Sequence, residues 1–325
     1  MKRGWKQVLL AILMGAVLPG AVIRIGGWTN APEASPTEQR TEAPETKPET
    51  SPGQPEAFFV KVLLTEEHSE NMELDDYLTG VVLGEMPADF EPEALKAQAV
   101  VARTYTLRVC DSGKKHSGGI CTDSVCCQSY ISPEEYISQG GTRASVDKIR
   151  GAVAATHSQV LTYGGELIQA TYFSCSGGRT EDAVAVWGAD VPYLRSTDSP
   201  GEEGAAHYTD TVCFSARAFA SALGIGLAGN PTTWLGDVTY TDGGGVDTMI
   251  IGGMTFRGTE LRQRLALRST AFTMTATRDG ITVTTKGYGH RVGMSQYGAD
   301  AMAASGSTYT QILAHYYQGT ELESR

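Results

Sequence analysis

The pattern of apolar and polar positions divides the 325-residue chain into three stretches. Residues 1–28 begin with basic side chains and continue as an uncharged, mostly apolar run over residues 7–23, which predicts a membrane anchor or a cleaved secretory signal. We favour a retained single-pass anchor with a cytoplasmic N-terminus, since no small-x-small cleavage site follows the run. Residues 29–56 interleave proline with glutamate and threonine, which predicts an extended linker. The folded part should occupy residues 57–325, outside the cytoplasm.

Residues 57–325 contain patterns typical of both strands and helices. β-Branched and aromatic side chains over residues 57–64 predict a strand. Proline at the first helical position and glutamate in the first turn predict a helix from Pro92 to about Arg108. Further helices are expected over 74–83, 145–156 and 259–267, and further strands over 159–162, 166–173, 207–213, 232–240 and 248–256. The fold class is therefore α+β, as one domain with a β-rich subregion over residues 205–275.

The composition narrows the class of protein only slightly. Hydrophobic residues make up 41% of the chain, and 38 glycines indicate many turns rather than a helical bundle. The net charge of -11 argues against a nucleic-acid partner, which would require a basic face. Part of that charge lies in the linker, so it says little about a binding site.

Glu85 is the first candidate for a catalytic residue. It lies in the stretch Gly84-Glu85-Met86-Pro87, directly after the apolar residues 80–83. A carboxylate beside apolar side chains is partly desolvated, which raises its pKa toward the range that a general acid needs near neutral pH. Taken alone, the stretch is more typical of a solvated glutamate that caps the next helix.

Five strings in the sequence occur in an order that is typical of one known family. They are GEMP at 84–87, ALKAQAVVARTY at 94–105, TYFSCSGGRTE at 171–181, GYGHRVGMSQYGA at 287–299 and HYYQGT at 315–320. Together they resemble the stage II sporulation protein D family, whose broader relatives include amidase-enhancer proteins. The resemblance covers about residues 57–320, and one string alone would be weak evidence.

This resemblance implies a catalytic domain with lytic transglycosylase activity on peptidoglycan glycan strands, with Glu85 as the catalytic acid. Such an enzyme needs one acid/base, because the 6-hydroxyl of the muramic sugar attacks its own anomeric carbon. Ordinary glycosidases use two carboxylates. Asp89 is the nearest second carboxylate in the sequence, and we expect it to face away from the cleft. If it faced the cleft, hydrolysis would become the better interpretation.

The resemblance also implies substrate-binding residues and partners. Glycines permit close approach of a ligand, and tyrosines offer flat faces for sugar rings. The expected substrate-binding residues are Arg103, Tyr105, Tyr172, Ser174, Ser176, His290, Ser295, Gln296 and Tyr297. By resemblance, the protein would act with stage II sporulation proteins P and M on peptide-stripped glycans between mother cell and forespore, during engulfment. The alternative is a non-catalytic amidase enhancer that binds glycan. Without the family context, residues 287–298 are equally typical of a glycine-rich turn that enters a helix.

Arg291 departs from the family pattern, since many relatives have a small residue at this position of the late motif. A role in narrowing the cleft and a contact with a substrate carboxylate are both consistent with the sequence.

Four of the six cysteines lie between residues 110 and 127, close to a histidine. His116, Cys121, Cys126 and Cys127 form a possible tetrahedral zinc set, although their spacing is not a standard zinc pattern. Some members of the family carry a structural zinc in the loop after the active-site helix. Outside the cytoplasm, disulfides that include Cys110 are the alternative, followed by free thiols. Zinc would be structural and not required for the chemistry.

Two further patterns favour ordinary structural roles. Cys175 could be a thiol nucleophile with His290 as its base, but no third orienting residue is identifiable, so we prefer a small residue that lines the cleft. Asp237, Asp242 and Asp247 in glycine-rich sequence could bind calcium, but solvated turn aspartates are far commoner.

Overall fold

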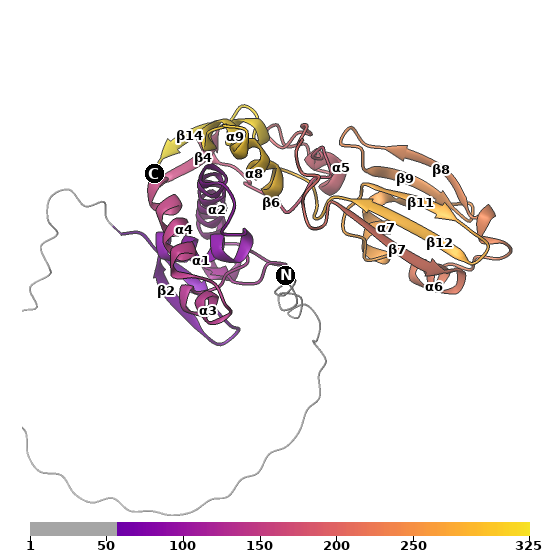
Figure 1. Ribbon diagram of the computed structural model, residues 1–325, viewed down its shortest axis with the longest axis horizontal. Helices are drawn as coiled ribbons and strands as arrows, with labels where there is room; N and C mark the ends of the chain where they lie inside the picture. The colour runs from indigo at the N-terminus through magenta and orange to yellow at the C-terminus, as the bar shows by residue number, and fades with distance from the viewer. Residues whose placement is uncertain (1–56) are drawn as a thin grey trace, which may run out of the picture. The chain divides into compact units, whose positions relative to one another are not determined.

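A computed structural model describes residues 57–325 of the chain, so the predicted anchor and linker lie outside the described residues. Within that described range, no helix has both the length and the apolar character that a membrane span requires. The described part is an α+β fold with small sheets of two or three strands (Figure 1), which confirms the predicted mixture of helices and strands.

The helices and strands alternate irregularly along the chain. The helices are α1 (Leu74–Glu85), α2 (Pro92–Ser112), α3 (Pro133–Ser138), α4 (Arg143–Ala155), α5 (Ala183–Trp187), α6 (Ala216–Leu223), α7 (Gly258–Arg264), α8 (Gln296–Ala304) and α9 (Tyr309–Tyr316). The strands are β1 (Phe59–Leu63), β2 (Ser69–Glu73), β3 (Ile120–Cys121), β4 (Gln159–Tyr163), β5 (Glu166–Leu167), β6 (Tyr172–Phe173), β7 (Thr209–Ser215), β8 (Leu235–Tyr240), β9 (Val246–Ile251), β10 (Met254–Arg257), β11 (Phe272–Ala276), β12 (Gly280–Lys286), β13 (Met294–Ser295) and β14 (Glu321–Ser324).

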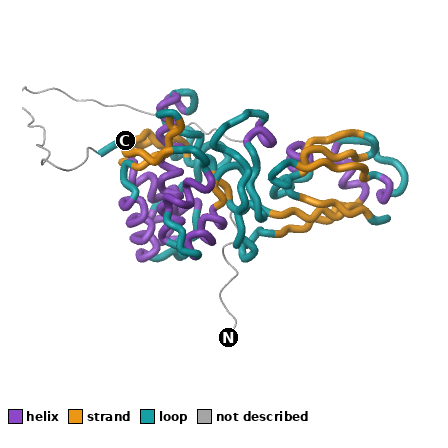
Figure 2. Tube along the Cα trace, turned by 90° about the horizontal axis from the view of Figure 1, so that it is seen from above, coloured by secondary structure: helices purple, strands orange, loops and turns teal. Residues whose placement is uncertain are grey.

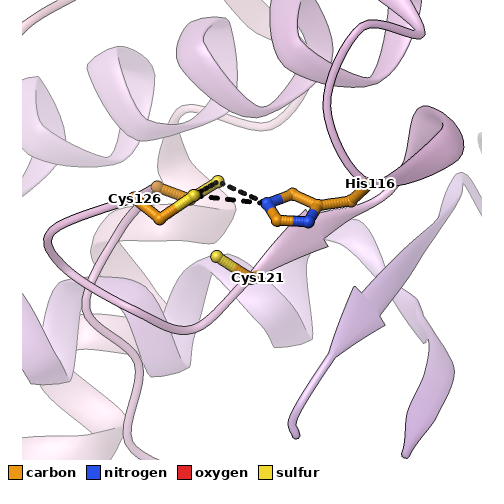
Figure 3. A group of neighbouring side chains, drawn as sticks. His116, Cys121 and Cys126 are labelled. Carbon is orange, nitrogen blue, oxygen red and sulfur yellow. Dashed lines mark hydrogen bonds between the residues drawn. The ribbon is translucent and has the colours of Figure 1, made fainter. Parts of the chain in front are cut away.

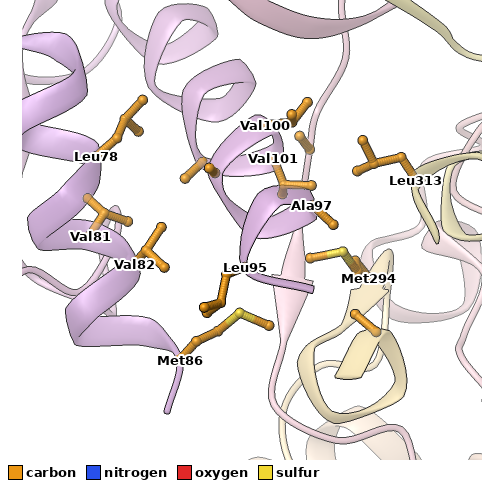
Figure 4. Packing of buried hydrophobic residues seen from close by; sticks show 14 of the residues in the cluster. Leu78, Val81, Val82, Met86, Leu95, Ala97, Val100, Val101, Met294 and Leu313 are labelled. Carbon is orange, nitrogen blue, oxygen red and sulfur yellow. The ribbon is translucent and has the colours of Figure 1, made fainter. Parts of the chain in front are cut away.

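Helix α2 is the centre of the larger hydrophobic core. It begins at Pro92, as predicted, and ends at Ser112, where Gly113 takes the left-handed conformation that glycine adopts readily. Its side chains pack against α1, α4, α8 and α9. Figure 4 shows Leu95 of α2 near Val82 of α1, and both side chains are fully buried. Burial of each such side chain contributes about 1.5–3 kcal/mol, so α2 fixes the position of the elements around it.

Short strand pairings bring distant motifs together. β6 pairs in parallel with β13, with Tyr172 opposite Met294 and Phe173 opposite Ser295. The sequence predicts one strand over residues 166–173, and this prediction is wrong. Instead, β5 pairs with β4, and the chain leaves that sheet before β6 pairs with β13. Residues 166–173 therefore contribute to two sheets, and the β6–β13 pairing places the motif at 171–181 beside the late motif.

The β-rich part of the chain has its own hydrophobic core. Its sheets have the strand orders β11-β12-β7 and β10-β9-β8, and Figure 2 draws their strands in orange. Phe219, Ile251, Leu261 and Val283 are fully or almost fully buried in this core. Strand β12 ends at Lys286, so the β structure continues beyond residue 275. A single strand over 248–256 is also wrong, because two glycines with positive φ at 252–253 turn the chain into a β9–β10 hairpin.

Arg291 connects the late motif to the motif at 171–181 through a buried ion pair, and to the β-rich part through the Gly243 carbonyl. The Arg291 Nη1–H donates to Glu181 Oε1 at 3.0 Å, and the side chains are only 2% and 1% exposed. The Arg291 guanidinium also donates to the carbonyls of Ser176, Arg179 and Gly243, each at 2.7 Å. Arg291 therefore stabilises the junction of these segments through four hydrogen bonds that its guanidinium donates. It does so despite a positive φ of 67°, which is unfavourable for a residue with a side chain.

Removing one partner of this pair should destabilise the protein strongly. In Arg291→Met, Glu181 would remain buried without its counter-ion, so we expect the free energy of unfolding to fall by about 3 kcal/mol. The double variant Arg291→Met/Glu181→Gln should recover part of that loss, because no uncompensated charge is left. Urea unfolding of the full chain measures both effects. Arg278→Met, at an exposed position on the β11–β12 turn, is the matched control and should change stability by less than about 0.5 kcal/mol. A loss below about 1 kcal/mol in Arg291→Met would show that the pair is dispensable.

Candidate active site

A cavity of about 570 Å³ lies between the end of α1, the loop over residues 124–129, β6 and the loop over residues 288–290. These segments come from four separate regions of the sequence, which α2 and the β6–β13 pairing bring together. The predicted site residues that line this cavity are Glu85, Tyr105, Tyr172, Ser174, His290 and Gln296. The structure therefore gathers most of the expected site around one concave surface.

Glu85 is the last residue of α1 and is half-buried in the cavity wall. The helix continues two residues beyond the predicted end at Leu83, so Glu85 lies on a helical turn and not in a loop. The Ser129 N–H donates to Oε1 at 2.7 Å, and Gln296 Nε2 lies 3.5 Å from Oε2. Burial raises the pKa of Glu85 above its ordinary value and outweighs these hydrogen bonds. The negative end of the helix dipole acts in the same direction.

Gly84 explains how the Ser129 N–H reaches this carboxylate. A Cβ on Gly84 would lie 2.9 Å from the Ser129 Oγ and 3.1 Å from the Tyr130 nitrogen. Only glycine lets the loop approach the end of α1 so closely. Gly84 is therefore required by the geometry around the acid.

Tyr172 lies beside Glu85 and stays protonated. Its hydroxyl donates to Gln128 Oε1 at 3.2 Å, and Gln128 in turn donates to Thr106 Oγ1 on α2 at 2.9 Å. Burial raises the pKa of Tyr172 well above its ordinary value, and the negative charge of Glu85 adds to this effect. The phenol is therefore a neutral, oriented group in the cavity wall.

Glu85 is the one carboxylate among the described residues that line this cavity. Asp89 is exposed and is not part of the lining. The cavity is thus equipped for chemistry that needs a single acid/base group.

Four of the expected substrate-binding residues lie outside this cavity: Arg103, Ser176, Ser295 and Tyr297. Arg103 is 1% exposed and donates to Asp75 Oδ1 at 2.8 Å and to the Thr156 carbonyl at 2.7 Å. Its guanidinium therefore holds α1 and α4 to α2. Tyr297 packs its ring edge-on to Phe90, with the ring centroids 5.0 Å apart.

Ser176 and Ser295 are both fully buried and bind Glu202, a residue that the sequence analysis missed. Both hydroxyls donate to Glu202, which also accepts hydrogen bonds from the Ser176 and Gly177 backbone N–H groups at 2.8 and 2.9 Å. Glu202 is 1% exposed and connects the end of the 171–181 motif to the start of α8. It lies in a polar loop that has no motif of its own, so the sequence carries no local signal for this role.

Cys175 has the wrong environment for a nucleophile. Its thiol is fully buried and donates to Glu202 Oε2 at 3.3 Å. Burial beside that carboxylate raises the pKa of the thiol to about 12, so the reactive thiolate is absent near neutral pH. The geometry therefore favours the small structural residue over the thiol nucleophile.

His290 is a neutral group in the cavity wall. The Val292 N–H donates to its Nδ1 at 3.1 Å, which leaves the proton of the neutral ring on Nε2. Burial lowers its pKa to about 4, and the positive charge of Arg262 adds to this effect. The ring lies between Phe173 and Trp187, at centroid distances of 5.6 and 5.2 Å.

The four predicted metal ligands lie close together, and Figure 3 labels His116, Cys121 and Cys126 among them. Their ligand atoms all lie within 4.8 Å of one another. His116 Nε2 lies 3.4 Å from Cys126 Sγ and 3.5 Å from Cys127 Sγ, and the two sulfurs are 3.9 Å apart. Tetrahedral zinc with ordinary bond lengths requires about 3.6 Å between nitrogen and sulfur and about 3.8 Å between sulfurs. His116, Cys126 and Cys127 therefore fit zinc in both ligand type and spacing, and Cys121 lies near enough to complete the set.

This cluster is the only gathering of three or more possible metal ligands within residues 57–325. The spaced aspartates 237, 242 and 247 do not form such a group there. Cys126 and Cys127 also line the cavity, and Ser129, two residues later, holds Glu85. One loop thus carries two of the candidate metal ligands and the N–H group that holds the candidate acid.

The fold and the site together define an α+β protein with one concave site around a partly buried carboxylate. A family described as stage II sporulation protein matches residues 65–163. The stage II sporulation protein D of Bacillus amyloliquefaciens is 42% identical over 270 residues, which cover 81% of this chain and 78% of that protein. The protein of the same name from Bacillus subtilis is 43% identical over 259 residues, covering 78% and 75%. An amidase enhancer of Bacillus subtilis is 30% identical over 308 residues, covering 76% of this chain and 40% of that protein. The chain belongs to the stage II sporulation protein D family.

Proposed function

We propose that this protein is a lytic transglycosylase that cleaves the glycan strands of peptidoglycan, with Glu85 as its acid and base. The observation that carries the proposal is the single carboxylate in the cavity. Its pKa is raised by burial, so a substantial protonated fraction is available nearer neutral pH than for a solvated glutamate.

The reaction requires only this group and the substrate. Glu85 donates its proton to the oxygen that bridges the muramic sugar to the next sugar, and the bond from the anomeric carbon to that oxygen breaks. The 6-hydroxyl of the same muramic sugar then attacks the anomeric carbon, and Glu85 takes the proton of that hydroxyl. The products are a new free 4-hydroxyl and a 1,6-anhydro end. No water is consumed, so a second carboxylate to activate water is unnecessary.

The other residues of the cavity would bind and orient the sugars. Tyr105 and Tyr172 offer flat faces and hydroxyl groups, which suit the apolar faces and polar edges of sugar rings. Neutral His290 and the amide of Gln296 can exchange hydrogen bonds with hydroxyl and N-acetyl groups. Gln296 also lies near Glu85 Oε2, so it would keep the carboxyl group aimed at the bridging oxygen.

We further propose that His116, Cys121, Cys126 and Cys127 hold a structural zinc ion, because the spacing of their ligand atoms suits tetrahedral coordination. Zinc would stabilise the loop that presents the Ser129 N–H to Glu85. It would take no part in the proton transfers.

The setting of the reaction is part of the proposal. The basic start and apolar run of the sequence favour a membrane anchor, with the folded part outside the cytoplasm. Membership of the family supports a role in sporulation, during engulfment, between mother cell and forespore. The expected partners are stage II sporulation proteins P and M, and the expected substrate is glycan that has lost its peptides.

A non-catalytic amidase enhancer is the second candidate, since a relative of that name is 30% identical to the chain. In that case the cavity would bind glycan, and another protein would cut the wall. A transglycosylase needs Glu85 in order to cleave glycan. An amidase enhancer needs the cavity only to bind glycan, so its function would not depend on the Glu85 carboxylate.

Mass spectrometry of the products separates these possibilities. The detergent-solubilised full chain would be incubated with peptide-free glycan strands, before and after borohydride reduction of the products. We expect 1,6-anhydro ends, which borohydride leaves unchanged. Reducing ends would overturn the transglycosylase in favour of a hydrolase, and binding without cleavage would favour the amidase enhancer.

A further inference from the structure

A second pocket, of about 460 Å³, adjoins the Glu85 cavity. Its lining includes Trp187 at the end of α5, Arg262 and Gln263 on α7, and His290. His290 also lines the Glu85 cavity, so one imidazole ring belongs to the walls of both hollows. We call this second hollow the Trp187 pocket.

Trp187 presents an aromatic face to this pocket. The side chain is 41% exposed, whereas Trp234 in the β-rich core is only 6% exposed. The indole packs on the His290 ring with a centroid distance of 5.2 Å and an angle of 56° between the planes. Large aromatic side chains usually bury most of their surface, so an indole left open beside a hollow indicates a ligand with a flat apolar face. The face of a pyranose ring has this character.

Arg262 is a half-buried cation in the wall of this pocket. Its Nε is buried and has no hydrogen-bond partner within residues 57–325. Arg262 lines the pocket, so an anion bound there would pair with its guanidinium. The flat fork of donors on arginine matches a carboxylate.

Gln263 adds a neutral polar group beside this cation. It is exposed and follows Arg262 on α7. An amide can both donate and accept hydrogen bonds, as recognition of an N-acetyl group requires. The pocket therefore combines a stacking surface, a carboxylate-binding group and an amide.

We propose that the Trp187 pocket is an additional glycan subsite that binds a muramic sugar further along the strand being cut. Trp187 stacks on the sugar ring, and Arg262 binds the carboxylate of its lactyl group. That carboxylate is free only where the peptide has been removed, since in peptide-bearing glycan it forms an amide bond. Arg262 is therefore a specificity-determining residue for peptide-free glycan. This inference rests on the proposed function, because it assumes that the Glu85 cavity holds the same strand.

Binding measurements in a full-length Glu85→Gln background test the subsite without cleavage. The probes are peptide-free GlcNAc–MurNAc oligosaccharides of increasing length and chitooligosaccharides of equal length, which lack the lactyl group. We expect affinity to rise with length until the pocket is filled. Trp187→Ala should weaken binding of the longer glycans about tenfold, which corresponds to about 1.4 kcal/mol, whereas Trp187→Phe should retain most of the affinity. Tyr240→Ala, at an aromatic residue that is 55% exposed and lies outside the pocket, is the control and should have no effect.

Arg262 is tested by the difference between the two ligand series. Arg262→Met should reduce the affinity for muramic glycans to that for chitooligosaccharides, and should leave the affinity for chitooligosaccharides unchanged. The subsite alone would be overturned if every glycan length bound equally to the parent, Trp187→Ala, Trp187→Phe and Arg262→Met. In that case, anhydro products would still support the proposed function. Reducing-end products with the expected binding losses would overturn the transglycosylase and keep the subsite. A parent protein that binds no glycan would overturn both.

Discussion

Glu85→Gln should lower the rate of glycan cleavage about 100- to 10,000-fold, the range that a general acid/base contributes. Glutamine has nearly the same shape and can keep the contact with the Ser129 N–H, but it cannot donate and recover a proton. Release of anhydro-ended fragments from peptide-free glycan measures the loss. Asp89→Asn is the matched control, and it should retain near wild-type activity because Asp89 lies outside the cavity lining. Equal losses in both variants would indicate a two-carboxylate mechanism.

The pH dependence of the same reaction follows from the raised pKa of Glu85. The working form of the acid is protonated, so kcat/KM should fall as the pH rises through this pKa.

The contribution of Glu85 to the free energy of unfolding should also fall as the pH rises. A carboxyl group whose pKa is raised by folding contributes stability below its unfolded pKa and loses it as the pH rises through the folded pKa. Glu85→Gln should therefore unfold at higher urea than the wild type at alkaline pH, and the difference should vanish at acidic pH. An inactive variant that is less stable at every pH would show that its lost activity reflects damage to the fold.

Removal of the proposed zinc ion should affect both stability and activity. Structural zinc in small domains contributes about 10–16 kcal/mol of apparent binding free energy at neutral pH, so its loss here should lower the unfolding temperature by many degrees. Activity should fall at least about tenfold, because Cys127 and Ser129 lie in one loop and the Ser129 N–H holds Glu85. Chelation followed by re-addition of zinc, with unfolding temperature and cleavage rate recorded at each stage, measures the effect.

Two variants separate a metal centre from other roles of the cysteines. Cys121→Ser removes one ligand and should reproduce the effect of chelation, whereas Cys213→Ser changes an exposed thiol outside the cluster and should be silent. Elemental analysis of protein purified without a histidine tag should give about one zinc per chain. Metal-free protein with thiols that resist alkylation would instead establish disulfides.

Local signals explain why much of the fold is predictable. Proline at the first helical position places the start of α2 at Pro92, and β-branched residues place β1 within residues 57–64. Strand ends are harder to predict, because the sequence over residues 166–173 indicates one strand, whereas β5 and β6 belong to different sheets. A periodic pattern shows that a segment is extended, but it does not show which neighbour the segment joins.

The candidate site is likewise predictable where local motifs carry it and unpredictable where distant residues pair. The sequence predicts the stretches that carry it, and six of the ten residues expected to act on substrate do line one cavity. Ser176 and Ser295 have the polar side chains of a sugar site but donate to Glu202 inside the protein. Arg291 likewise has a charge suited to a substrate carboxylate, yet its partner is the buried Glu181. Each buried polar group takes a partner that is distant in sequence, so its role cannot be read from its own motif.

Short stretches of the chain are enough to identify the family, the position of the main helix and the residue types available for chemistry. The packing of the whole fold, by contrast, sets which of those residues face the cavity and makes Glu85 the one carboxylate there within residues 57–325. It also brought Trp187 and Arg262 together around His290. These outcomes depend on how segments that are distant in the sequence pack together, and burial then affects the charge and pKa of the groups in the cavity wall.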